Sequence, residues 1–221
     1  MENITVARVR RIAAGMAVLM AAMLIYWLAA MPPAGARTLR QFDPDRMADL
    51  ELRMWQAYYG KERVRLFTLL VTLLREQNHS SWATATREGF HLARAAATFG
   101  DARANYESVL PDLENAFATV RDWSRARFDP RAVARAELAW WVARRTPGQD
   151  SAEHVGRLMA DAYALLYEVP RAQVTTAALL RARAAALRDA EAERPNWAEV
   201  GHLLQESYRD LRAALENGGS D

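Results

Sequence analysis

Two glutamates, Glu51 and Glu137, stand in an unusual place for charged residues, inside apolar stripes of helical period. Each has an apolar residue four positions before it and a tryptophan four positions after it: Met47 and Trp55 around the first, Val133 and Trp141 around the second. A buried carboxylate is costly unless a donor or a cation pairs with it, or a proton neutralises it. We therefore predict a buried polar network around both glutamates, with Tyr58 and Arg144 as partners. The network is either structural or the site of a functional acid or metal ligand.

Three of the four histidines follow a glutamate by three residues: Glu76/His79, Glu88/His91 and Glu199/His202. This spacing resembles the ligand pairs of ferritin-like di-metal bundles, in which both side chains point inward from one helix. Two of the pairs share a predicted helix face with charged residues, and the third falls at a predicted helix end. We interpret all three as solvated pairs. Glu88 and His91 remain the metal candidates, and no cofactor is expected.

Aromatic residues form the other candidate surface. We predict that Trp55, Trp140 and Trp141 line a groove for a partner or ligand, because exposed apolar surface often marks a contact site. The sequence has no glycine-rich phosphate loop, no Gly-x-Ser-x-Gly elbow and no cysteine. Thiolate chemistry and disulfides are therefore excluded, and we expect a protein that is not an enzyme.

The charge balance argues against a nucleic-acid partner. The whole chain has a net charge of +2, and residues 1–36 hold Arg8, Arg10 and Arg11 against Glu2. The remainder is therefore neutral, with 26 basic and 26 acidic residues. A neutral domain lacks the positive surface that binds phosphate backbones.

An uncharged run of nineteen residues, 12–30, follows the three N-terminal arginines. As a helix it would span about 29 Å, which matches a bilayer core. We predict that residues 1–36 form a single-pass membrane anchor. The alternative is a cleaved signal peptide and secretion, because Ala34-Gly35-Ala36 has the form of a cleavage site. The arginines before the run are more tightly clustered than those after it, which favours an N-terminus inside and a helical domain on the extracytoplasmic side.

Helices must position all of these residues. Ala, Leu, Arg and Glu dominate the chain, and no stretch alternates as a strand would. After a linker at 37–41, prolines, glycines and capping aspartates divide the remainder into helices, and a disordered tail follows at 216–221. The predicted helices are 44–78, 82–99, 103–124, 130–145, 152–168, 171–191 and 196–215.

An internal repeat relates the two halves of the chain. Phe42-Asp43-Pro44 recurs as Phe128-Asp129-Pro130, and the match extends in register over sixteen residues. We predict an all-α bundle of six to seven helices at 42–215, built by duplication of a three-helix unit. The first unit covers residues 42–124, and the second covers residues 128–215. The second unit contains an extra helix at 171–191.

Together these patterns predict a membrane-anchored interaction or scaffold module, held by residues 12–30 and bound to a protein partner. The prediction depends on the anchor, the neutral charge balance and the missing catalytic signatures. A metal- or small-molecule-binding helical enzyme that uses Glu51 and Glu137 is the alternative.

Overall fold

The structure is a computed structural model that describes residues 2–31 and 37–217, with side chains from Gly15 onward. Within these ranges the chain forms nine α-helices, one 3-10 helix and no strand. The helices are α1 (Glu2–Ala30), α2 (Pro44–Tyr59), α3 (Arg63–Asn78), α4 (Trp82–Asp101), η1 (Tyr106–Val109), α5 (Leu110–Ser124), α6 (Pro130–Arg145), α7 (Ala152–Tyr167), α8 (Arg171–Ala190) and α9 (Trp197–Asn217). The all-α class predicted from the sequence is confirmed.

Side-chain caps determine where several helices begin. Asp43 and Asp129 each precede a proline and accept backbone N–H groups from the first turns of α2 and α6. Ser81 and Ser151 cap α4 and α7 in the same way. Each cap satisfies a donor that has no partner within the helix, so the chain enters the helix at a defined residue.

The predicted single helix at 44–78 is wrong, because two helices occupy this stretch. α2 ends at Tyr59, Gly60 caps it, and Lys61 takes a left-handed backbone with φ 59° before α3 begins at Arg63. A left-handed residue cannot continue a right-handed helix. One glycine inside a helical pattern is a weak signal, because helices tolerate it at a cost of about 1 kcal/mol.

The two halves of the bundle consequently match helix for helix. Helices α2 to α5 have 16, 16, 20 and 15 residues, and α6 to α9 have 16, 16, 20 and 21. The three-helix unit with an extra helix is therefore corrected to two sets of four. Residues that correspond in the repeat are buried alike: Phe42 and Phe128, Met47 and Val133, Ala57 and Ala143. A common origin of the two sets stays a prediction.

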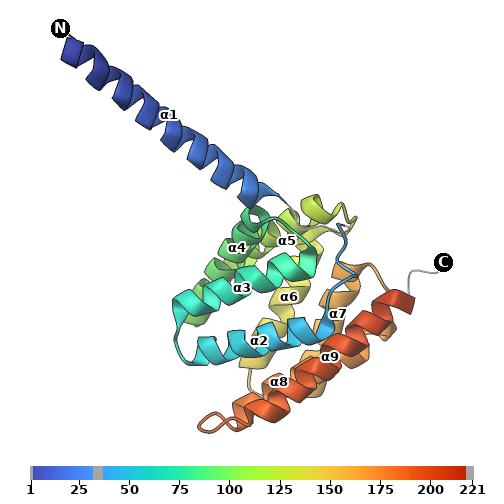
Figure 1. Ribbon diagram of the computed structural model, residues 1–221. Helices are drawn as coiled ribbons and strands as arrows, with labels where there is room; N and C mark the ends of the chain where they lie inside the picture. The colour runs from blue at the N-terminus through green and yellow to red at the C-terminus, as the bar shows by residue number, and fades with distance from the viewer. Residues whose placement is uncertain (1, 32–36, 218–221) are drawn as a thin grey trace.

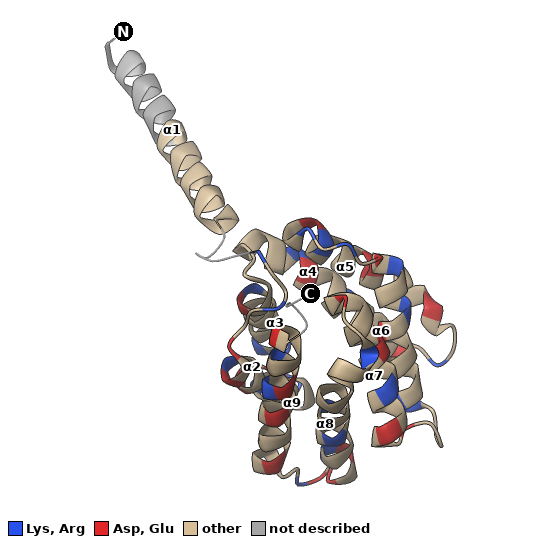
Figure 2. Ribbon diagram, turned by 90° about the vertical axis from the view of Figure 1, so that its right-hand side faces the viewer, with Lys and Arg blue, Asp and Glu red and all other residues tan. Residues whose placement is uncertain are grey.

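Helices α2 to α9 form a closed ring (Figures 1 and 2). Each helix packs against its neighbours in sequence, and α9 returns to pack against α2. Arg209 forms an ion pair with Asp45 at 2.7 Å across this closure, and the Arg212 guanidinium donates to the carbonyl of Arg40. Closure turns one side of each helix toward a shared interior.

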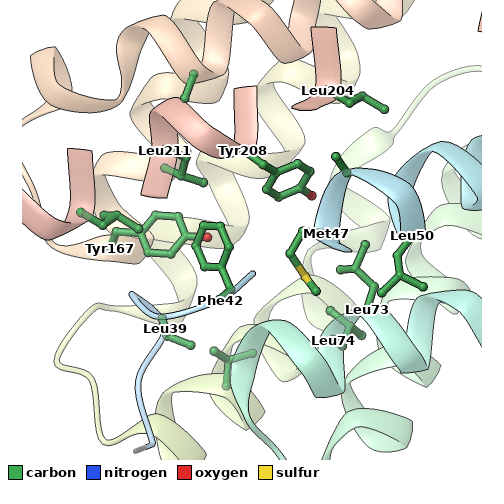
Figure 3. Packing of buried hydrophobic residues seen from close by; sticks show 14 of the residues in the cluster. Leu39, Phe42, Met47, Leu50, Leu73, Leu74, Tyr167, Leu204, Tyr208 and Leu211 are labelled. Atoms are coloured by element: carbon green, nitrogen blue, oxygen red, sulfur yellow. The ribbon is translucent and has the colours of Figure 1, made fainter. Parts of the chain in front are cut away.

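An apolar interface joins the two ends of the ring (Figure 3). Phe42, which precedes α2, packs edge to face on Tyr208 of α9, with ring centroids 6.1 Å apart. Met47 of α2 is almost completely buried there together with Leu204 and Leu211 of α9. Burial contributes about 1.5–3 kcal/mol for each side chain of this size, so the closure is strongly stabilised.

Helices α7 and α8 pack closely at Gly156. A Cβ there would lie 3.0 Å from the Cα atom of Leu179 and 3.2 Å from its Cδ1 atom. We expect Gly156→Ala to destabilise the fold by about 1–2 kcal/mol, because α8 must shift and this cost exceeds the gain in helix propensity. The difference is measured by urea unfolding. Gly100→Ala is the matched control: a Cβ at Gly100 of α4 meets nothing within 4 Å, so that variant should become more stable. A stabilised Gly156→Ala protein would contradict the close packing.

Helix α1 extends away from the ring (Figures 1 and 2). Its described side chains are apolar and exposed, with Val18, Met23 and Ile25 between 67% and 71% accessible. Among the residues whose side chains are described, no helix combines the length and apolarity needed to cross a membrane.

Three predicted features lie partly or wholly outside the described residues. The side chains of 12–14, which begin the predicted span, are not described, and neither is the possible cleavage site at 34–36. At the other end, α9 extends two residues into the predicted tail, to Asn217, and 218–221 lie outside the description.

Candidate functional site

A buried ion pair lies inside the ring. Arg181 of α8 donates two hydrogen bonds to Oε1 of Glu51 on α2, from Nε at 2.9 Å and from Nη2 at 2.6 Å. The Glu51 side chain is 1% exposed and that of Arg181 is 20% exposed. α2 and α8 are not neighbours in the ring, so the two side chains meet in its interior rather than between adjacent helices.

This pair leaves one acceptor unused. Burial alone would lower the pKa of Arg181, but the Glu51 carboxylate outweighs burial and holds that pKa well above its ordinary value. Within the described part of the chain, the buried Oε2 atom of Glu51 finds no hydrogen-bond partner. A buried acceptor without a donor costs about 1–3 kcal/mol. The hydroxyl of Tyr208 is a donor close to this carboxylate, since a hydrogen bond to Glu51 contributes to its raised pKa.

Two tyrosines, Tyr163 of α7 and Tyr208 of α9, border the ion pair. Burial raises the pKa of both hydroxyls, and the negative charge of Glu51 raises it further. Arg181 opposes this effect at both residues but does not overcome it. Both hydroxyls therefore stay protonated, able to donate one hydrogen bond and accept others.

Glu137 approaches the same interior from α6. Its carboxyl group is half-buried, and its Oε1 atom accepts the indole N–H of Trp141 at 3.0 Å. Burial raises the pKa of Glu137, and the charge of Glu51 adds to the rise. Donation from Trp140 and Trp141 and the charge of Arg181 oppose the rise without cancelling it. Glu137 is thus a carboxyl group that holds its proton more tightly than an exposed one.

We call Glu51, Glu137, Tyr163, Arg181 and Tyr208 the inner cluster. It brings together two carboxylates and one guanidinium, so it carries one uncompensated negative charge when all three are ionised. Uncompensated charge is costly where water is largely excluded. A proton on Glu137, or an added cation, would complete the cluster.

The partners predicted for the two glutamates lie elsewhere. Tyr58 is 55% exposed and packs edge to face on Tyr59. Arg144 donates to Oδ2 of Asp189 at 2.8 and 3.0 Å and to the Tyr59 hydroxyl at 3.1 Å. Neither Tyr58 nor Arg144 joins the inner cluster, because each projects from the end of its helix rather than from the side that faces the interior.

The three tryptophans of the predicted groove are half-buried and belong to three different apolar clusters. Trp141 packs against Phe99 of α4 with ring centroids 5.3 Å apart. Trp140 and Trp141 contact each other in a T-shaped arrangement at 6.0 Å and border the inner cluster near Glu137. Trp55 packs separately, against the large core of α2, α3 and α9.

Glu88, interpreted from the sequence as solvated, is in fact buried at 4% exposure. The Nδ2 atom of Asn78 lies 3.2 and 3.0 Å from its two carboxyl oxygens. The interpretation from sequence assumed that one side of this helix is covered. α4 packs between α3 and α5, so two of its sides are covered. Burial raises the pKa of Glu88 to about 8, although the Asn78 amide opposes the rise.

His91 points away from Glu88, toward α5. Its Nδ1 atom lies 3.1 Å from Oδ1 of Asp112, and Arg94 holds the other carboxylate oxygen at 2.6 Å. Burial would raise the pKa of Asp112, but hydrogen bonds from Arg94 and His91 outweigh it and the pKa is lowered. Among the described residues, no three acidic or imidazole side chains are grouped to hold a metal ion.

Sequence patterns missed three members of the inner cluster: Tyr163, Arg181 and Tyr208. Arg181 lies four residues after Ala177 and three after Ala178, on the buried side of α8. This spacing is the sequence signal that could have identified Arg181 as facing the interior. The signal is weak, because alanine is common on both the covered and the exposed sides of a helix and so does not indicate which side is covered.

Comparisons with protein-family models, with curated proteins and with solved structures found no match. The function of this chain must therefore be argued from its own side chains.

Proposed function

We propose that the chain is a membrane-anchored interaction module, in which α1 is the anchor and the ring of α2 to α9 binds a protein partner. The exposed apolar surface of α1 carries this proposal. Met16, Leu24 and Leu28 are each more than half exposed, at 57%, 56% and 54%. Apolar surface of this extent needs lipid or protein around it. Tyr26 and Trp27 stand near the end of the helix, where aromatic residues are common at the membrane interface.

The proposed orientation has the N-terminus inside and the ring on the extracytoplasmic side. It depends on the tight arginine cluster at positions 8, 10 and 11, because basic residues are retained on the cytoplasmic side. The ring is neutral overall, which fits a protein partner better than a nucleic acid.

We expect the full chain to sediment with membranes and to remain there after alkaline extraction. Leu19→Arg should weaken this retention, because arginine at the centre of a membrane helix costs about 2.5–3.5 kcal/mol. Val64→Arg is the matched control: Val64 is an apolar residue of the ring, 84% exposed, and its replacement should leave retention unchanged. Immunoblots of the membrane and soluble fractions measure the outcome.

Two results would revise this proposal. A mature protein whose N-terminal residue is Arg37 would replace the anchor with a signal peptide. A reporter fused to the C-terminus that is active only in the cytoplasm would reverse the orientation.

A metal- or small-molecule-binding enzyme that uses Glu51 and Glu137 is the second candidate. The half-buried Glu137 favours it, because a carboxyl group with a raised pKa suits proton transfer. Elemental analysis of the purified full chain distinguishes the two candidates. Stoichiometric iron, manganese or zinc would favour the enzyme, whereas a protein recovered reproducibly with the chain from native membranes would favour the interaction module.

A further inference from the structure

We propose that the outer face of α4 lies on the headgroup region of an anionic phospholipid membrane. This inference rests on the proposed function, because it takes α1 as the membrane anchor, and it adds a second membrane contact made by the ring itself. α1 packs against α4 and ends beside it in both views of the molecule (Figures 1 and 2). A solvent-facing side of α4 is therefore held close to the membrane surface.

Two large aromatic residues are exposed on this face. Trp82 and Phe90 are 44% and 55% accessible, and the exposed Thr86 lies between them on the same side of the helix. In the described part of the ring, three other large apolar side chains are exposed, each on a different helix. α4 thus concentrates exposed aromatic surface, and tryptophan and phenylalanine are typical of helices that lie in a membrane interface.

The exposed charges of the same face are positive. Arg87 and Arg94 are exposed, whereas Glu88, the one carboxyl residue between Trp82 and Thr98, is buried. Among the described residues, Arg94 pairs with Asp112 of α5 at 2.6 Å, and Arg87 has no carboxylate partner. A face with aromatic rings, basic residues and no exposed acid is complementary to anionic lipid.

Arginine side chains also lie over both aromatic rings. The guanidinium carbon of Arg75 on α3 is 4.6 Å from the centre of the Trp82 ring, and that of Arg94 is 5.8 Å from the centre of the Phe90 ring. Each ring can therefore enter the boundary of the acyl chains while a guanidinium beside it stays among the phosphates. Lipid is favoured over a protein on this face, because α1 already brings it to the membrane.

The test places a fluorophore on α4 of the full chain. The chain has no cysteine, so Thr86→Cys provides a single attachment site. The labelled protein is reconstituted into nanodiscs of phosphatidylcholine, or of an equal mixture of phosphatidylcholine and phosphatidylglycerol, with nitroxide-labelled lipid as the quencher. We expect quenching that is stronger in the anionic discs, and we expect high salt to remove the difference between the two compositions.

Thr176→Cys is the matched control for the label. Thr176 is an exposed threonine of α8, on the far side of the ring from α1 (Figures 1 and 2). A fluorophore there should be quenched little in either kind of disc.

Arg87→Gln tests the contribution of charge. We expect it to lower the ratio of docked to free α4 faces about fivefold in the anionic discs, which is the contribution of one basic residue near such a surface. The ratio is measured from the quenched and unquenched lifetimes of the fluorophore at Thr86→Cys. Arg194→Gln, at an exposed arginine between α8 and α9, is the matched control and should leave the ratio unchanged.

The outcomes separate this inference from the proposed function. Equal quenching of the two labels, or equal quenching in the two kinds of disc, would overturn the inference while α1 remains an anchor. A label at Thr86→Cys that native membranes shield and pure lipid discs do not would assign the face to a protein partner instead. A chain that does not enter the discs would overturn the proposed function, and this inference with it.

Discussion

Arg181→Met should destabilise the fold by about 3–5 kcal/mol, because it leaves the Glu51 carboxylate buried without a cation. The methionine keeps most of the apolar stem of the side chain, so little of the loss comes from packing. Arg181 donates both of the hydrogen bonds that Glu51 accepts among the described residues, and a water molecule in the interior would replace them only in part. Urea unfolding of the full chain in a mild detergent measures the change.

Arg183→Met is the matched control for this prediction. Arg183 lies on the same helix and pairs with Glu153 at 3.6 Å, with both side chains at least half exposed. Such exposed pairs contribute about 0–1 kcal/mol, so the control should lose little. The double variant Glu51→Met/Arg181→Met removes both charges and should recover much of the loss. Equal losses in Arg181→Met and Arg183→Met would show that the interior pair is not isolated from water.

Raising the pH from 5 to 9 should cost the protein about 4 kcal/mol of stability through Glu88 alone. The pKa of Glu88 rises from 4.5 to about 8 on folding, because burial disfavours the charged carboxylate. At pH values below 4.5 the group is protonated in both states. Between 4.5 and 8 the folded state alone keeps the proton, so stability falls as the pH rises, and above 8 the loss is complete.

Glu88→Gln should remove this pH dependence. The amide keeps the size of the side chain and its contact with Asn78, and it cannot ionise. At pH 5 the variant should match the unaltered protein, and at pH 9 it should be more stable by about 4 kcal/mol. Glu199→Gln, at an exposed site, is the control and should leave the pH dependence unchanged. If the two glutamine variants show the same dependence, the carboxyl group of Glu88 is hydrated rather than buried.

The helices were predictable where local chemistry fixes their ends. Asp43-Pro44 and Asp129-Pro130 place a cap and a proline together, and the structure begins α2 and α6 there. The break at Gly60 was missed because it depends on a left-handed Lys61, a residue type that rarely takes this backbone. A helix boundary is therefore predictable where two local signals coincide, such as a capping aspartate and a proline, and poorly predictable where a single glycine marks it.

The site was only partly predictable, for a different reason. Glu51 and Glu137 were identifiable because a charge inside an apolar stripe is visible within one helix. Their surroundings come from α7, α8 and α9, and the guanidinium of Arg181 lies 130 residues away from Glu51 in the chain. Which helix faces which across the interior depends on how the ring closes, and no pattern within a single helix specifies that.

Closure of the ring also determines when the apolar side of α2 can be covered during synthesis of the chain. α2 is synthesised before α9, yet Met47 of α2 is covered by α9. Until α9 is complete, the apolar side of α2 has no final partner, and a chain that stops before Trp197 would expose that side together with the facing side of α8. Exposed apolar surface of this kind attracts chaperones and proteases.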